Sequence, residues 1–216
     1  MIALLAPCLL HAEDEWQFWA DGNITAGLSR NLKAKVGIQS RLDDSGSLIQ
    51  EHSDLGIAYT GLADWLDLGL NYRVVFRELD EEVWKYESRP HLNATARFRL
   101  FGLAFSNRLR LEYNSPEDFS DFGTVRNKLS LNPPVYLDPV RERLRMRHYK
   151  VKPFASYEFF YNTSTETVSR HRFRGGVSWT LTERVLCDFY YLRQEDRASL
   201  TQGDINVAGL NLKLLF

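Results

Sequence analysis

The chain has little cysteine, little net charge and no long apolar run. Of its 216 residues only Cys8 and Cys187 are cysteines, and the 27 basic side chains nearly balance the 28 acidic ones. This balance argues against a nucleic-acid binder that relies on overall positive charge. No segment approaches the ~20 apolar residues of a transmembrane helix, which excludes a helical membrane protein. A transmembrane β-barrel stays open, because half the residues in each of its strands are polar.

Familiar catalytic and metal-binding motifs are also missing from the sequence. It contains no Gly-rich phosphate loop, no Ser nucleophile elbow, no His-x-x-x-His pair and no Asp-x-Asp-x-Asp-Gly calcium loop. Ser169 and His171 lie two residues apart, on one face of a predicted strand, but no Asn or acid completes a triad nearby. We therefore interpret this pair as interfacial packing, and we expect no catalytic residue, no cofactor and no metal.

The first residues resemble the end of a secretory signal. Residues 2–10 form the longest apolar run, and the small residue Ala12 and an acidic stretch follow it. This order predicts export with cleavage after Ala12, although the expected positive n-region is missing. A short buried strand or helix is the alternative. Cleavage would leave a signal remnant at 1–12, a single domain at 13–216, and Cys187 as the sole cysteine, which excludes an intrachain disulfide. Export without disulfides suits a bacterial envelope protein.

Alternation with a period of two is the dominant pattern in the rest of the chain. Over residues 66–77 the even positions are apolar, and the odd positions are polar or small except Val75. A helix would repeat its apolar positions every three or four residues, so this pattern predicts a β-strand. The same pattern predicts strands at 16–29, 33–42, 53–62, 65–77, 84–99, 101–113, 142–151, 153–161, 168–181, 184–194 and 204–216. A twelfth strand is predicted at 123–131, where the alternation is weakest.

The predicted connections alternate between short and long. The short ones lie near 30–32, 63–64, 100, 152 and 182–183. The longer, polar ones lie at 43–52, 78–83, 114–122, 132–141, 162–167 and 195–203. Short turns at one end and long loops at the other are typical of outer-membrane barrels. We therefore predict an all-β fold: a transmembrane, antiparallel, up-and-down β-barrel of 10–12 strands, with 12 as the best estimate.

Three further features favour a membrane barrel over a soluble sandwich or a lipocalin-like barrel. Several predicted strands are longer than the 5–6 residues typical of globular proteins. Aromatic residues cluster near strand ends, as interfacial girdles do. These clusters contain Trp16, Phe18, Trp19, Tyr72, Phe76, Trp84, Tyr86, Phe159, Phe160, Tyr161, Tyr190 and Tyr191.

The third feature is the alternating segment 204–216, which ends on Phe216. It resembles the closing strand of bacterial outer-membrane proteins, whose terminal aromatic is read by the assembly machinery. The expected partners are therefore outer-membrane lipids and, through Phe216, the barrel assembly machinery. We expect no nucleic-acid partner, and the sequence leaves the oligomeric state open.

Short motifs in a fixed order give the chain a family resemblance. They are Trp65-Leu66 with Asn71-Tyr72-Arg73, Arg89-Pro90-His91, the run from Ser106 to Tyr113, Arg143-Leu144-Arg145, Glu158-Phe159-Phe160, Asp188-Phe189-Tyr190-Tyr191 and the closing Phe216. In these the chain resembles a bacterial family without an assigned activity, domain of unknown function 2490, over most of residues 16–216. Segment 114–141 departs from the pattern. The resemblance implies an outer-membrane barrel and supplies no substrate or catalytic residue.

The alternation also predicts a charged lumen with an excess of arginine. The lumen candidates are Arg73, Arg97, Arg99, Arg108, Arg110, Glu112, Arg145, Glu158, Arg172 and Asp188. Two interpretations follow: arginines paired with carboxylates can plug a narrow barrel, or they can line a path that favours anions. The acidic loops are read as solvated charge.

We therefore expect a non-enzymatic outer-membrane β-barrel that is structural or forms a narrow, porin-like, anion-favouring passive pore. The alternatives are an outer-membrane lipid-modifying enzyme and a soluble lipocalin-like barrel that encloses a hydrophobic ligand.

Overall fold

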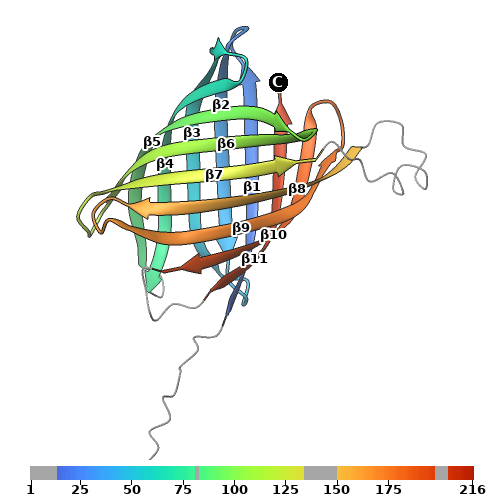
Figure 1. Cartoon of the computed structure of the whole chain (residues 1–216). Helices are drawn as coiled ribbons and strands as arrows, with labels where there is room; N and C mark the ends of the chain where they lie inside the picture. Colours follow the sequence, from blue (N-terminus) through green and yellow to red (C-terminus); the bar gives the residue numbers. More distant parts are fainter. Residues whose placement is uncertain (1–13, 81–82, 134–149, 198–203) are drawn as a thin grey trace, which may run out of the picture.

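The structure is a computed structural model that describes residues 14–80, 83–133, 150–197 and 204–216. Within these ranges eleven β-strands form one closed barrel (Figure 1). They are β1 (Glu15–Gly27), β2 (Leu32–Leu42), β3 (Leu48–Ala63), β4 (Leu66–Asp80), β5 (Val83–Leu100), β6 (Leu103–Pro116), β7 (Phe122–Asn132), β8 (Lys150–Asn162), β9 (Thr167–Thr180), β10 (Val185–Asp196) and β11 (Ile205–Leu215). None of the described residues forms a helix long and apolar enough to cross a membrane.

The all-β barrel is confirmed, but the best estimate of twelve strands is wrong for the described residues. The weakly predicted strand at 123–131 is present as β7. The strand expected at 142–151 lies outside the described residues except for its last two, which open β8. The short turn expected at residue 152 is also wrong, because that residue lies inside β8. The single proline of β8, Pro153, did not end the strand.

The barrel closes through a parallel pair, so the prediction of a wholly antiparallel barrel is wrong. β1 and β11 run side by side from Glu15 opposite Ile205 to Thr25 opposite Leu215, whereas each other neighbouring pair is antiparallel. The reason is the strand number. When each strand reverses the direction of the one before it, the first and the eleventh point the same way.

We call the end where β1 begins the lower end and the end where it finishes the upper end, as in Figure 1. The turns 28–31, 64–65, 101–102 and 181–184 join strands at the upper end. The chain leaves β7 and enters β8 at this same end. The long connection predicted at 132–141 therefore starts at the end where the short turns lie, not with the other long loops, and its residues from 134 on lie outside the described residues.

The shortest turn at the upper end shows how local sequence determines the geometry of a hairpin. β5 and β6 are joined by Phe101 and Gly102 alone, and their φ angles are 50° and 78°. Two-residue hairpin turns of this kind need positive φ at both positions because that twist matches the strands, and glycine meets the requirement without strain.

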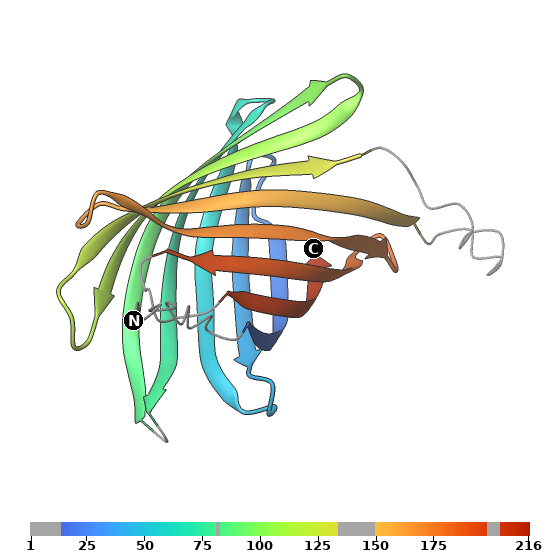
Figure 2. The ribbon, with the colours of Figure 1, turned by 60° about the horizontal axis from the view of Figure 1, so that its bottom comes forward.

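The apolar face of the strands lies on the outside of the barrel. Leu55, Leu70, Leu92 and Leu111 are each at least half exposed, and many more large apolar side chains share their outward direction. The alternate positions point into the lumen, where even the apolar exception Val75 is buried. A soluble barrel that encloses a hydrophobic ligand would have the opposite arrangement. Viewed with its lower end forward, the strands of the two walls cross in projection, as strand tilt in a closed barrel requires (Figure 2).

Candidate functional site

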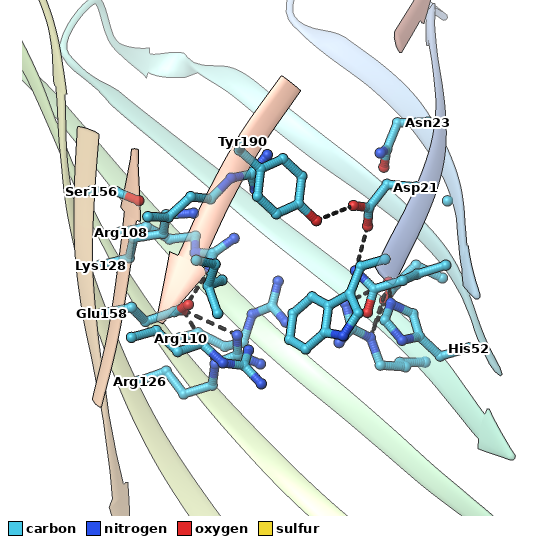
Figure 3. Close-up of a pocket in the computed structure, with 18 of the residues that line it drawn as sticks. Asp21, Asn23, His52, Arg108, Arg110, Arg126, Lys128, Ser156, Glu158 and Tyr190 are labelled. Carbon is cyan, nitrogen blue, oxygen red and sulfur yellow. Dashed lines mark hydrogen bonds and ion pairs between the residues drawn. The ribbon is translucent and has the colours of Figure 1, made fainter. Parts of the chain in front are cut away.

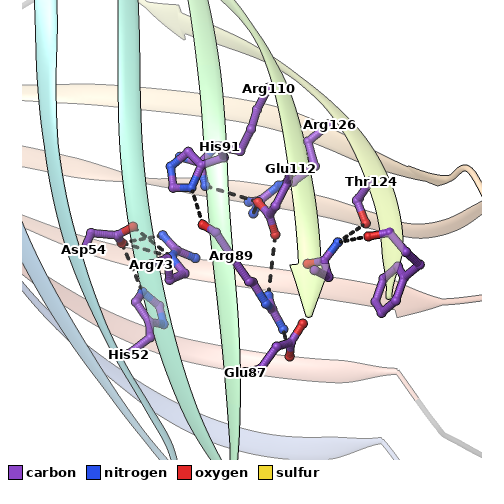
Figure 4. A network of polar contacts seen from close by, with 12 residues as sticks. His52, Asp54, Arg73, Glu87, Arg89, His91, Arg110, Glu112, Thr124 and Arg126 are labelled. Atoms are coloured by element: carbon purple, nitrogen blue, oxygen red, sulfur yellow. Dashed lines mark hydrogen bonds and ion pairs between the residues drawn. The ribbon is translucent and has the colours of Figure 1, made fainter. Parts of the chain in front are cut away.

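The lumen carries a network of buried ion pairs centred on Glu112 of β6. Its carboxylate lies 3.2 Å from Arg126 Nη1, 3.5 Å from Arg110 Nη1 and 3.6 Å from Arg89 Nη1 (Figure 4). These arginines come from β7, β6 and β5, whose alternation turns all of them inward. A buried carboxylate that serves several guanidinium groups removes the cost of leaving those charges unpaired.

Two further carboxylates extend the network around the wall. Glu158 of β8 lies 2.8 Å from Arg108 Nη2 and 3.0 Å from Arg126 Nη2. Asp54 of β3 accepts two hydrogen bonds from Arg73 Nε and one of 2.6 Å from its Nη2, in a fork geometry. Arginine forms such paired contacts with carboxylates because its donors lie in one plane. Glu112 and Glu158 therefore tie β5 to β8 through shared arginines, and the separate Asp54–Arg73 pair ties β3 to β4.

A stack of arginines and aromatic rings crosses the lumen near its lower end. The Arg41 guanidinium carbon lies 3.9 Å from the Trp19 ring centroid, and that of Arg172 lies 5.1 Å from Trp19 and 4.7 Å from Phe160. The Arg126 guanidinium carbon lies 4.3 Å from the Phe160 ring centroid. We call these five residues the arginine–aromatic layer. It reaches from β2 through β1, β9 and β8 to β7, and cation–π attraction is strongest in such desolvated positions.

An apolar cluster packs the arginine–aromatic layer against β10 and β11. Trp19, Tyr190, Leu192, Ile205 and Val207 pack together inside the barrel, and Val207 has no exposed surface. The Trp19 indole N–H donates to Gln17 Oε1 at 2.8 Å, so its one polar atom is satisfied while the ring is buried.

Above the layer the lumen holds two adjoining cavities. One of about 180 Å³ is lined by residues of both walls, among them Trp19, Arg108, Lys128 and Tyr190 (Figure 3). The second, of about 270 Å³, extends toward the upper end and includes Lys35 in its lining. Both cavities share the lining residues Asn23, Asp54, Arg73, Arg108 and Arg110. At the upper mouth Arg97 pairs with Asp67, and Arg99 is exposed.

The structure separates the predicted lumen residues into three groups. Arg110, Glu112, Glu158, Arg172 and Asp188 are buried inside the barrel. Arg73 and Arg108 line the cavities, while Arg97 and Arg99 lie at the mouth. Arg145 lies outside the described residues.

Several lumen side chains differ from the sequence-based prediction or are missing from it. Trp19, Phe160 and Tyr190 were expected in an outward girdle, but they are buried in the lumen. Their spacing indicates the inward direction, because Trp19, for example, lies two residues from both Gln17 and Asp21 and so shares the polar face of its strand. The predicted lumen set lacks Arg126 and Lys128, although the alternation within β7 places both on its polar face.

The remaining candidates for chemistry find other partners. His171 Nδ1 lies 2.7 Å from the Tyr157 hydroxyl, and the Ser169 hydroxyl contacts the Phe160 carbonyl, so neither contact joins Ser169 to His171. No group of three His, Cys, Asp or Glu side chains in the described ranges could hold a metal. In the β2–β3 loop, hydrogen bonds from Ser45 and from the backbone of Ser47 lower the pKa of Asp43, which satisfies this acid without a cation.

The family model of a protein of unknown function (DUF2490) matches residues 16–202. The chain belongs to the DUF2490 family. No curated protein matches it. Among solved structures it is similar to LpxR from Salmonella typhimurium, with a TM-score of 0.51 and 10% identity, over 85% of this chain and 83% of that one. It is also similar to the beta domain of the Bordetella autotransporter BrkA, with a TM-score of 0.44 and 13% identity, over 77% of each chain.

At this identity the likeness to LpxR shows the fold alone, which is an outer-membrane-like β-barrel. The DUF2490 description assigns no activity. Functional inference for this member of the family therefore depends on the lumen.

Proposed function

We propose that this DUF2490 protein is an integral outer-membrane β-barrel without enzymatic activity, whose lumen is closed to steady solute flow. We propose that its role is structural, or that its cationic lumen cavities are open to solutes on one side of the membrane. The observation that carries the proposal is the buried arginine–aromatic layer, which spans the lumen between opposite walls.

The outer surface supports placement in a membrane. Large apolar side chains such as Ile38, Leu62 and Leu70 are more than half exposed on strands of 11 to 16 residues. Exposing so much apolar surface to water is unfavourable, whereas lipid chains accept it. An apolar groove of about 370 Å³ on the β2–β6 wall has space for acyl chains.

The lower half of the lumen supports closure. Gln17, Gln50, Asn114, Thr124 and Gln194 surround the layer, and each is buried. Side chains that line a water-filled channel keep contact with water, whereas these polar groups bond to other protein groups. Asn114 donates to Thr124 at 2.9 Å, and Arg172 donates to Gln194 at 2.8 Å. This internal bonding supports the interpretation in which paired polar side chains plug the arginine-rich lumen.

Planar-bilayer recording tests the proposal directly. The wild-type protein should give no steady current at any voltage, whereas replacing the two rings of the layer (Trp19→Ala with Phe160→Ala) should open anion-selective steps. A matched control, Trp16→Ala with Phe18→Ala, removes aromatic rings from the outward face of the same region and should stay silent. Steady anion-selective current through the wild-type barrel would overturn closure and favour the passive pore.

A further inference from the structure

The lumen cavity of about 180 Å³ has more positive charge than its carboxylates can balance. Its lining cations are Arg41, Arg73, Arg108, Arg110, Arg126, Lys128, Arg172 and Arg174. Its lining carboxylates are Asp21, Asp54 and Glu158. Glu112 and Asp188 pair with lining arginines from just outside the cavity, and cations still remain in excess. Charges in such a confined space are stable only when countercharge is present.

The strand register places cations directly opposite one another. Arg110 faces Arg126, and Arg108 faces Lys128, across the β6–β7 ladder. Like charges at such positions repel and destabilise a sheet. Glu112 bridges the first pair, and Glu158 contacts Arg108 in the second. Among the described residues Lys128 forms no hydrogen bond or ion pair. Glu158 faces it across the β7–β8 ladder, but that carboxylate already pairs with Arg108 and Arg126, so three cations share one carboxylate.

Several donors around this pair have no acceptor in the described protein. They include Arg108 Nε and Arg174 Nε. The Ser156 hydroxyl lies on the same wall, since Ser156 faces Arg174 in the β8–β9 ladder. Figure 3 shows Arg108, Lys128 and Ser156 close together beside Tyr190. Unsatisfied buried donors are rare in folded proteins because each costs the desolvation of its polar group.

We propose that this cavity binds a phosphate-class oxyanion through Arg108, Lys128, Ser156 and Arg174. A doubly charged tetrahedral oxyanion supplies both the missing charge and several acceptors, and it matches the fork of an arginine better than a halide does. Access is from the upper end, through the adjoining cavity that contains Lys35. The site requires the placement of these side chains in the lumen, and it does not require the layer to block current.

The phosphate can come from a free solute or from the headgroup of a lipid. Titration calorimetry of the detergent-solubilised protein, at constant ionic strength, compares inorganic phosphate, a phosphorylated monosaccharide and a diacyl phosphatidic acid. Binding of the first two supports a soluble ligand, and binding of the lipid alone supports a headgroup. Chloride replaces phosphate in the blank titration.

The decisive variant is Lys128→Met. It breaks no direct ion pair, since Glu158 keeps Arg108 and Arg126 as partners, and it removes one member of a repulsive pair. The phosphate-free barrel should therefore be at least as stable as the wild type. Its phosphate affinity should fall by about tenfold, the effect of losing one charge-assisted hydrogen bond. Lys33→Met is the matched control, since Lys33 lies on β2 as an exposed cation and outside both cavity linings.

Three outcomes overturn the proposal. These are no saturable binding in any arm, chloride competing as well as phosphate, and Lys128→Met binding phosphate like the wild type. Each is independent of the bilayer recording, so failure of the anion site and failure of lumen closure are distinguishable.

Discussion

The ring of Tyr190 occupies the space that a side chain at position 209 would need. A β-carbon built on Gly209 would lie 2.0 Å from Tyr190 Cζ. The two residues face each other across the β10–β11 ladder, and the tyrosine hydroxyl donates to Asp21 at 2.8 Å, beyond the glycine. The missing side chain thus allows Tyr190 to cross β11 and tie β10 to β1, on the far side of the closing pair.

Gly209→Ala should therefore destabilise the barrel. We expect a loss of ~1–3 kcal/mol in the free energy of unfolding, the usual effect of overpacking, measured by urea titration in detergent micelles. Gly175→Ala is the control, because a β-carbon there meets nothing nearer than 4.0 Å. Equal stability of the two variants would contradict the packing described for Tyr190.

Glu158→Gln should be strongly destabilising. The carboxylate lies in the buried network and serves both Arg108 and Arg126, so its neutralisation leaves buried positive charge uncompensated. The expected cost is ~3–5 kcal/mol. Asp67→Asn breaks the Arg97–Asp67 pair at the mouth, where the arginine side chain is 50% exposed, and should cost less than ~1 kcal/mol. Similar unfolding midpoints in urea would show that the network is solvated.

Leu70→Arg tests whether the outward face lies in a membrane. Leu70 lies in the middle of the apolar face of β4, while Leu100 ends β5 at the upper turn, and their exposures are similar at 54% and 49%. In lipid vesicles arginine should cost ~2–4 kcal/mol at Leu70 and only ~0–1 kcal/mol at Leu100, because the penalty depends on depth. A soluble barrel should respond alike at both positions.

An amide pair interrupts the outward apolar face. Asn107 of β6 and Asn127 of β7 donate to each other, at 3.0 and 2.9 Å. Asn107→Leu alone leaves an amide unpaired beside lipid, which should cost ~1–3 kcal/mol, whereas the double leucine variant should be nearly neutral. A double-mutant cycle in vesicles measures the coupling, and additive single effects would contradict a shared bond.

The sequence predicts much of this architecture because each strand has two faces. The alternation over residues 66–77 predicts both the strand and its inward Arg73 without any knowledge of the neighbours. Hydrophobicity does not predict the inward direction of Phe160, because it does not distinguish a ring stacked on Arg126 from one at a membrane interface. Only the spacing of two residues between Phe160 and Glu158 carries that information. The parallel pairing that closes the barrel cannot be predicted from the pattern within single strands either. An error of one in the number of strands reverses the direction expected for β11 relative to β1.

The parallel seam has a consequence for the order of folding. Each other strand pairs with its neighbour in the chain, but the seam joins residues far apart, such as Asn23, whose side-chain amide donates a hydrogen bond to Asn211. Bringing such distant segments together costs more loop-closure entropy than forming a hairpin, and folding slows as contacts become less local. Pairing of β1 with β11 should therefore come last. Until then both strands are open sheet edges, available to pair with other chains.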